Sequence, residues 1–135
     1  MADVAYVLGI LSSIPLDWYA RRFVELHLTF QLLSAFPMPS PDRSDPLRQR
    51  VVEIAGELAA VDARYAAWAE ELGVSVGSRH IHEEREDGIA ELDAVVSHLY
   101  GLDEEDVVHI FETFHDGWDY TDRLEQVLEH FRRLA

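Results

Sequence analysis

The sequence predicts a mainly α-helical fold in which one long helix packs with three or so shorter helices, plus one β-strand near residues 27–36. Three observations lead to this prediction. Apolar residues make up 48% of the 135 residues, which is enough to build a buried core. In five stretches they recur at intervals of three and four, the period of a helix with one apolar face. Glycine or proline stands at the ends of several stretches, where helices usually stop.

Residues 1–43 are expected to form a helix–helix–strand segment. One apolar face of a first helix is marked by Val4, Val7, Leu8, Leu11 and Ile14. Pro15 ends this helix and stands close to the first turn of a second one, over Leu16–Glu25. Polar and apolar residues alternate from Leu26 onward until two prolines end the run, which favours the strand near residues 27–36.

The clearest pattern in the sequence is a heptad repeat that begins after Asp45, a helix-capping residue, and Pro46. Its apolar positions are Leu47, Val51, Ile54, Leu58, Val61, Tyr65, Trp68 and Leu72. Gly73 is expected to end the helix. A helix of about 27 residues is about 40 Å long, more than so small a domain needs for its own core. We therefore expect these eight residues to form an interface with a partner.

Three further helices are expected in the helical scaffold segment, residues 44–135. The first spans about residues 83–100 and ends at Gly101. The second begins with Asp103 and Asp106 in a capping arrangement, and the third covers about Thr121–Leu134. The segments 1–43 and 44–135 together are expected to form one continuous domain.

The chain is strongly acidic, with 26 Asp and Glu against 11 basic residues and a net charge of −15. All the basic residues are arginine, and most of the excess acid lies after residue 69. This balance disfavours a free-standing phosphate-binding surface. Any contact with nucleic acid would come from the more neutral first half, through Arg21, Arg22, His27 and Gln31. A structural role, with the arginines in salt bridges, fits Arg21 and Arg22 equally well.

Catalytic and metal-binding motifs are missing from the sequence. It contains no phosphate loop, nucleophile elbow or helical His-Glu-x-x-His pair, so we expect neither an enzyme nor a cofactor or metal site. A small metal-dependent hydrolase that uses His80, His82 and nearby acids is a less favoured alternative. The chain also lacks cysteine, a secretory signal pattern and a long apolar segment, so we expect a cytoplasmic protein with no membrane contact.

Four stretches together resemble the C-terminal end of large adenine-specific DNA methyltransferases, the type IIG restriction-modification enzymes and related phage-defence methylases. They are residues 4–23 (VAYVLGILSSIPLDWYARRF), 36–41 (FPMPSP), 51–55 (VVEIA) and 89–102 (IAELDAVVSHLYGL). The resemblance implies a target-recognition region followed by a long spacer helix. The methyltransferase signatures of that family, a Gly-rich cofactor loop and an Asn-Pro-Pro-Tyr tetrad, are absent, and without lysine a Glu-x-Lys nuclease motif cannot occur.

The resemblance implies a noncatalytic recognition and scaffold segment. In this role the chain would work with a methyltransferase or restriction subunit and would contact DNA only as part of that complex. The alternative is a stand-alone acidic helical module for protein–protein interaction, either a homodimer formed through the long helix or a protein whose acidic surface imitates DNA.

Overall fold

The computed structural model describes residues 1–24 and 27–135, and in these residues the protein is mainly helical, with no β-strand. The elements, in chain order, are α1 (Ala2–Leu11), α2 (Ile14–Ala20), α3 (Phe30–Ser34), α4 (Pro46–Ala59), the 3₁₀ turn η1 (Ala63–Tyr65), α5 (Ala66–Leu72), α6 (His82–Leu99), α7 (Glu104–Glu112) and α8 (Thr121–Leu134). Within this described part, no helix is both long enough and apolar enough to cross a membrane.

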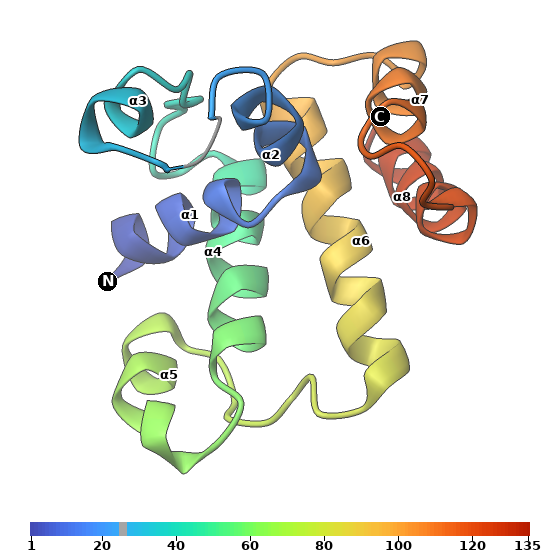
Figure 1. The fold of residues 1–135 in the computed structure, drawn as a ribbon. Helices are drawn as coiled ribbons and strands as arrows, with labels where there is room; N and C mark the ends of the chain where they lie inside the picture. Colours follow the sequence, from blue (N-terminus) through green and yellow to red (C-terminus); the bar gives the residue numbers. More distant parts are fainter. Residues whose placement is uncertain (25–26) are drawn as a thin grey trace.

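Helices α4 and α6 run antiparallel through the middle of the molecule (Figure 1). Helix α1 packs on α4, and α7 and α8 lie on the other side of α6. Helix α6 therefore has neighbours on both faces, and all its residues from 90 to 97 are buried. Tyr6, Ile10 and Leu16 from the first 43 residues share one core cluster with Val51 and Ile54, so the two predicted segments pack against each other.

A fully buried carboxylate, Asp93 on α6, joins the two sides of the fold. Its Oδ1 accepts a hydrogen bond from the backbone N–H of Ile14 at 2.9 Å, and its Oδ2 accepts bonds from Nε and Nη2 of Arg123 at 3.1 and 2.6 Å. Burial raises the pKa of Asp93, and the charge and hydrogen bonds of Arg123 oppose that shift. The Ser13 hydroxyl, next to the first residue of α2, instead donates to the carbonyl of Ile10. Asp93 thus caps α2 from another helix.

Several helix boundaries that the sequence predicts are confirmed. Asp45 accepts hydrogen bonds from the first backbone N–H groups of α4, and Pro46 occupies the first turn. Asp103 and Asp106 form the predicted capping box at the start of α7. Gly73 ends α5 with a φ of 69°, a left-handed conformation that glycine adopts without strain.

The prediction of one long helix over Leu47–Leu72 is wrong. Helix α4 ends at Ala59, because Ala60 leaves the helical conformation and its carbonyl accepts a hydrogen bond from the N–H of Gly77 at 2.8 Å. Asp62 then caps a new turn, and α5 folds back onto α4. The indole of Trp68 donates to the carbonyl of Gly56 at 3.1 Å. The heptad pattern therefore arises from two short helices that pack on each other.

Most of the eight heptad residues pack against other residues of the same chain. Val51 and Ile54 are fully buried, and Leu47 and Leu58 pack against the same core cluster. Trp68 and Leu72 are partly buried, and the Leu72 side chain faces Gly56. Only Val61 and Tyr65 are exposed. The predicted partner interface is thus largely the core of this protein, and the structure offers no 40 Å rod to a partner.

The expected strand near residues 27–36 is not found. Residues 30–34 instead form α3, whose first turn is capped by the Thr29 hydroxyl. The Phe36–Pro39 segment that follows is fixed by two tyrosines, since Tyr6 donates to the carbonyl of Pro39 and Tyr100 to that of Pro37. The predicted second helix ends at Ala20, and its last residue, Glu25, lies with Leu26 outside the described residues.

A test of this packing is Gly9, where α1 crosses α4. An added Cβ would lie much closer than van der Waals contact to Cγ1 of Val51, a branched side chain with no room to move. Alanine stabilises an exposed helix by about 1 kcal/mol over glycine, but overpacking costs about 1–3 kcal/mol. We expect Gly9→Ala to lower the free energy of unfolding by about 1 kcal/mol in urea titrations.

The matched control is Gly56→Ala, where the new Cβ would meet the flexible end of Leu72 at 3.0 Å. We expect this variant to be nearly as stable as the wild type. A Gly9→Ala protein of wild-type stability would contradict the close crossing of α1 and α4.

Candidate functional site

The outer face of α1 carries an apolar stripe that the rest of the described chain covers only in part. Val4, Val7, Leu8 and Leu11 follow the i, i+3, i+4, i+7 spacing of one helix face, and their exposed fractions are 56, 40, 39 and 38%. They are four of the five residues that define the predicted apolar face. The sequence pattern is therefore correct for a helix, but the face that it marks points outward.

The inner face of α1 explains this orientation. It buries Ala5, Tyr6, Gly9 and Ile10, a set that includes small residues and lets α1 approach α4 closely. The four aliphatic residues of the stripe are left on the opposite, outer side. A helix that is apolar on all sides usually lies inside a protein, so the stripe on α1 is typical of a surface that a partner covers.

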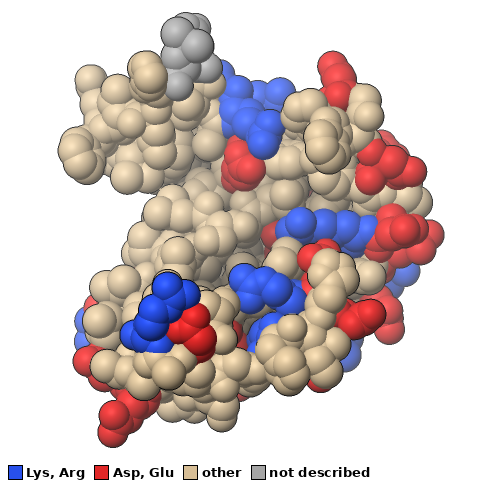
Figure 2. Space-filling view, turned by 60° about the horizontal axis from the view of Figure 1, so that its bottom comes forward, with Lys and Arg blue, Asp and Glu red and all other residues tan. Residues whose placement is uncertain are grey.

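A groove of about 400 Å³ adjoins the stripe and lies between α1, α4 and α6. Its walls include Leu8 of α1, Leu58 of α4 and Ile89 of α6, and two cationic side chains, Arg85 and Arg123, also line it. Figure 2 shows a hollow near the middle of one face of the molecule, with uncharged surface on one side and basic side chains on the other. The groove and the stripe share Leu8 and so form one continuous surface.

An arginine can attract an anion most strongly where no carboxylate of the chain already neutralises its charge. Among the described residues, nine arginines form an ion pair with Asp or Glu: Arg21, Arg43, Arg48, Arg50, Arg64, Arg79, Arg123, Arg132 and Arg133. Arg22 and Arg85 form no such pair in that part of the chain. Arg22 lies over the ring of Trp18, away from the groove, whereas Arg85 lines the groove and donates from Nη1 to the carbonyl of Leu58 at 3.1 Å.

A second candidate surface is an open bowl of about 670 Å³ lined by Arg21, Arg22, His109 and His115. The Arg21 guanidinium lies 4.3 Å above the ring of Phe114, and that of Arg22 lies 4.3 Å above Trp18. These contacts hold two of the predicted nucleic-acid residues side by side on one surface. Arg21 is also paired with Asp17 at 3.2 Å, which neutralises part of its charge.

The other two predicted nucleic-acid residues do not join this bowl. His27 and Gln31 are exposed, and neither lines the cavity that Arg21 and Arg22 share. Sequence reasoning also missed Arg85 and Arg123 of the groove. A useful signal is Asp93, a carboxylate between Leu92 and the apolar residues 94–96, because a buried acid requires a cationic partner elsewhere in the chain.

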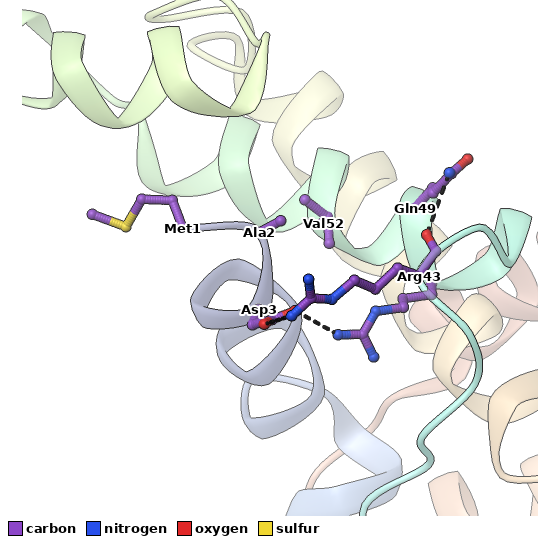
Figure 3. A pocket seen from close by; sticks show the side chains of 7 residues that line it. Met1, Ala2, Asp3, Arg43, Gln49 and Val52 are labelled. Atoms are coloured by element: carbon purple, nitrogen blue, oxygen red, sulfur yellow. Dashed lines mark hydrogen bonds and ion pairs between the residues drawn. The ribbon is translucent and has the colours of Figure 1, made fainter.

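A third cavity, of about 380 Å³, lies at the start of α1 and is shown in Figure 3. There the Asp3 carboxylate accepts hydrogen bonds from Arg48 at 2.9 Å and Arg43 at 2.6 Å. The hydrogen bond from Arg48, aided by the charge of Arg43, holds the pKa of Asp3 below its usual value. Both cations are thus occupied within the chain, so this cavity is a weaker anion site than the groove.

The histidines do not form a metal centre in the described part of the chain. Nowhere in residues 1–24 and 27–135 do three His, Asp or Glu side chains come together in a way that could hold a metal ion. The ring of His80 is 2.8 Å from the carbonyl of Gly77, which fixes it in the loop before α6.

Comparison with known proteins finds no matching family model, no matching curated protein and no matching solved structure. The chemistry of the surfaces described above is therefore what bears on function.

An internal ion cluster gives a test of the electrostatics. Glu91 on α6 accepts hydrogen bonds from Nε and Nη2 of Arg50 at 2.9 and 2.7 Å, and Arg133 approaches it at 3.4 Å. Burial opposes ionisation of Glu91, but the hydrogen bonds and charge of Arg50, with smaller contributions from His130 and Arg133, outweigh it and hold its pKa below the usual value of 4.5.

We therefore expect this cluster to stabilise the protein above about pH 4.5 and to lose its effect as the pH falls through the lowered pKa of Glu91. The unfolded chain takes up the proton first, so stability decreases with acid. Glu91→Gln should lower the free energy of unfolding at neutral pH by about 1–3 kcal/mol. It should also flatten the decline of stability below pH 4.5, measured by urea titration at a series of pH values.

The control is Glu129→Gln, which removes the same charge from an exposed position on α8. An equal effect of both substitutions would mean that the cluster contributes nothing beyond net charge.

Proposed function

We propose that this chain is an acidic helical module that binds another protein through the outer face of α1, and that it acts in the cytoplasm. The single observation that carries the proposal is the uncovered stripe of Val4, Val7, Leu8 and Leu11. The sequence contains no cysteine that an oxidising compartment could make into a disulfide, which is in accord with the proposed location.

The partner is a different protein rather than a second copy. Each copy carries a net charge of −15, so two copies repel each other. A helix of ten residues is only about 15 Å long, and a stable interface buries about 800 Å² on each side. A symmetric contact of α1 with α1 therefore falls short, whereas a partner that covers both the stripe and the groove beside it buries more surface.

The experiment is a selection of displayed helical peptides, with apolar residues at i, i+3, i+4 and i+7, on the folded chain. We expect binders whose affinity falls by at least thirtyfold when Val4→Gln and Leu8→Gln are combined, because burying each aliphatic side chain contributes about 1.5–3 kcal/mol. Both residues are exposed, so the double variant should keep its unfolding midpoint.

The control is Phe30→Gln, which removes an apolar side chain that is even more exposed, from α3. Binding that is insensitive to the α1 substitutions, or absent altogether, would contradict the proposal. Sedimentation of the isolated chain completes the test, because a tight homodimer that Leu8→Gln dissociates would replace a foreign partner with a second copy.

A second function has a specific observation in its favour, the pair of arginines at the α2 bowl. We infer from the resemblance to adenine-specific methyltransferases that the chain could serve as a noncatalytic recognition segment of a restriction-modification complex. Arg21 and Arg22 would then contact DNA phosphates while a methyltransferase or restriction subunit supplies the chemistry. The acidic remainder of the surface would face that subunit rather than the duplex.

In a complex reconstituted with such a subunit, Arg21→Gln with Arg22→Gln should weaken DNA binding equally on all sequences. It should also reduce the slope of log affinity against log salt by about two, one for each lost phosphate contact. Arg43→Gln with Arg64→Gln, which alters two exposed arginines elsewhere, is the control. If adding this chain changes neither DNA affinity nor sequence choice, this second function is wrong.

A further inference from the structure

The groove beside α1 combines two features, an apolar lining and a cation without an acidic partner. Its walls are mostly apolar, and it holds Arg85, which forms no ion pair with a described carboxylate. We infer that the partner segment is an amphipathic helix that places one Asp or Glu side chain against Arg85 and Arg123 while its apolar residues cover Leu8 and Ile89. This inference rests on the proposed function and specifies the chemistry of the partner.

Arg85 has more hydrogen-bond donors than its contact with Leu58 uses. A guanidinium carries five N–H groups, and in the structure one nitrogen of Arg85 bonds the carbonyl of Leu58. Glu57 lines the adjoining cavity, and its carboxylate is bound by Nε of Arg79 at 2.7 Å. The remaining donors of Arg85 are therefore available for a planar carboxylate, which a guanidinium can bind through two hydrogen bonds.

Arg123 supplies a second cation at the same groove. It is held by Asp93 through Nε and Nη2, so the position of its guanidinium is fixed before a ligand arrives. The Nη1 group takes no part in that contact. Because Asp93 neutralises this arginine, Arg85 carries the uncompensated charge and Arg123 contributes hydrogen bonds.

The shape of the surface favours a peptide helix over a free acyl chain. A small amphiphile binds best in an enclosed pocket that covers most of its surface. Here the groove opens directly onto the α1 stripe, so its apolar surface is continuous with Leu8 and Leu11. A helix with residues at i, i+3, i+4 and i+7 can cover both parts at once.

The experiment uses the displayed library of helical peptides, with the apolar positions fixed and all other positions random, selected on the wild-type chain and on Arg85→Gln. We expect Asp and Glu to be enriched at one position of the binders to the wild type and not at that position on the variant. A selected peptide should bind Arg85→Gln about tenfold more weakly, and its own Glu→Gln form should no longer distinguish the two proteins.

Arg64→Gln is the matched control, since it removes the same charge from an exposed turn outside the groove. It should leave both the enrichment and the affinity unchanged. Thermal unfolding and circular dichroism of each variant establish that the fold is retained.

The outcomes separate this inference from the function on which it rests. Binders that need Val4 and Leu8 but show no acidic preference, or a preference that persists in Arg85→Gln, overturn the inference and leave the interaction module standing. Absence of any peptide that needs the stripe overturns both. Binding of dodecanoate that depends on Arg85, with no peptide binding, would also overturn the inference of a helical partner, because the groove would then bind an acyl carboxylate.

Discussion

The buried Asp93 carboxylate is the interaction on which the arrangement of helices depends. It lies at the centre of α6 and bonds both the first N–H of α2 and the guanidinium of Arg123 on α8. Three helices that are distant in sequence therefore meet at one side chain. Breaking a buried ion pair by removing one partner costs about 3–5 kcal/mol, so this contact fixes where α1 and α2 can lie relative to the rest.

That constraint also determines which side of α1 is free. With α2 tied to Asp93, the short link through Ser12 and Ser13 holds α1 against α4, and Gly9 lets the two helices come close. The side of α1 that fits this crossing carries Ala5 and Gly9 beside Tyr6 and Ile10. The aliphatic residues on the opposite side then have no internal surface to cover, which is why a chain with a well-filled core still exposes an apolar stripe.

Some features of this fold can be predicted from local sequence patterns, and others cannot. Local signals were sufficient for the capping box at Asp103 and Asp106 and for the mainly helical class, because capping depends on neighbours three residues apart. The long heptad helix failed since periodicity reports that residues share a face and says nothing of whether the chain turns back. Ala60 ends α4 through a hydrogen bond from Gly77, which is distant in sequence. Pairings such as that of Asp93 with Arg123 are likewise invisible to any local pattern.

The charge distribution points to the same surface as the packing does. An excess of 15 negative charges means that almost every arginine in the described chain can find a carboxylate nearby. An arginine that instead bonds a main-chain carbonyl at the edge of an apolar groove is therefore unusual in this protein, and it lies next to the uncovered face of α1. At physiological salt, charges interact over only about 8 Å. In the proposed interaction the net charge would therefore act mainly on the approach of a partner, whereas Arg85 and the α1 stripe would hold and orient the bound partner.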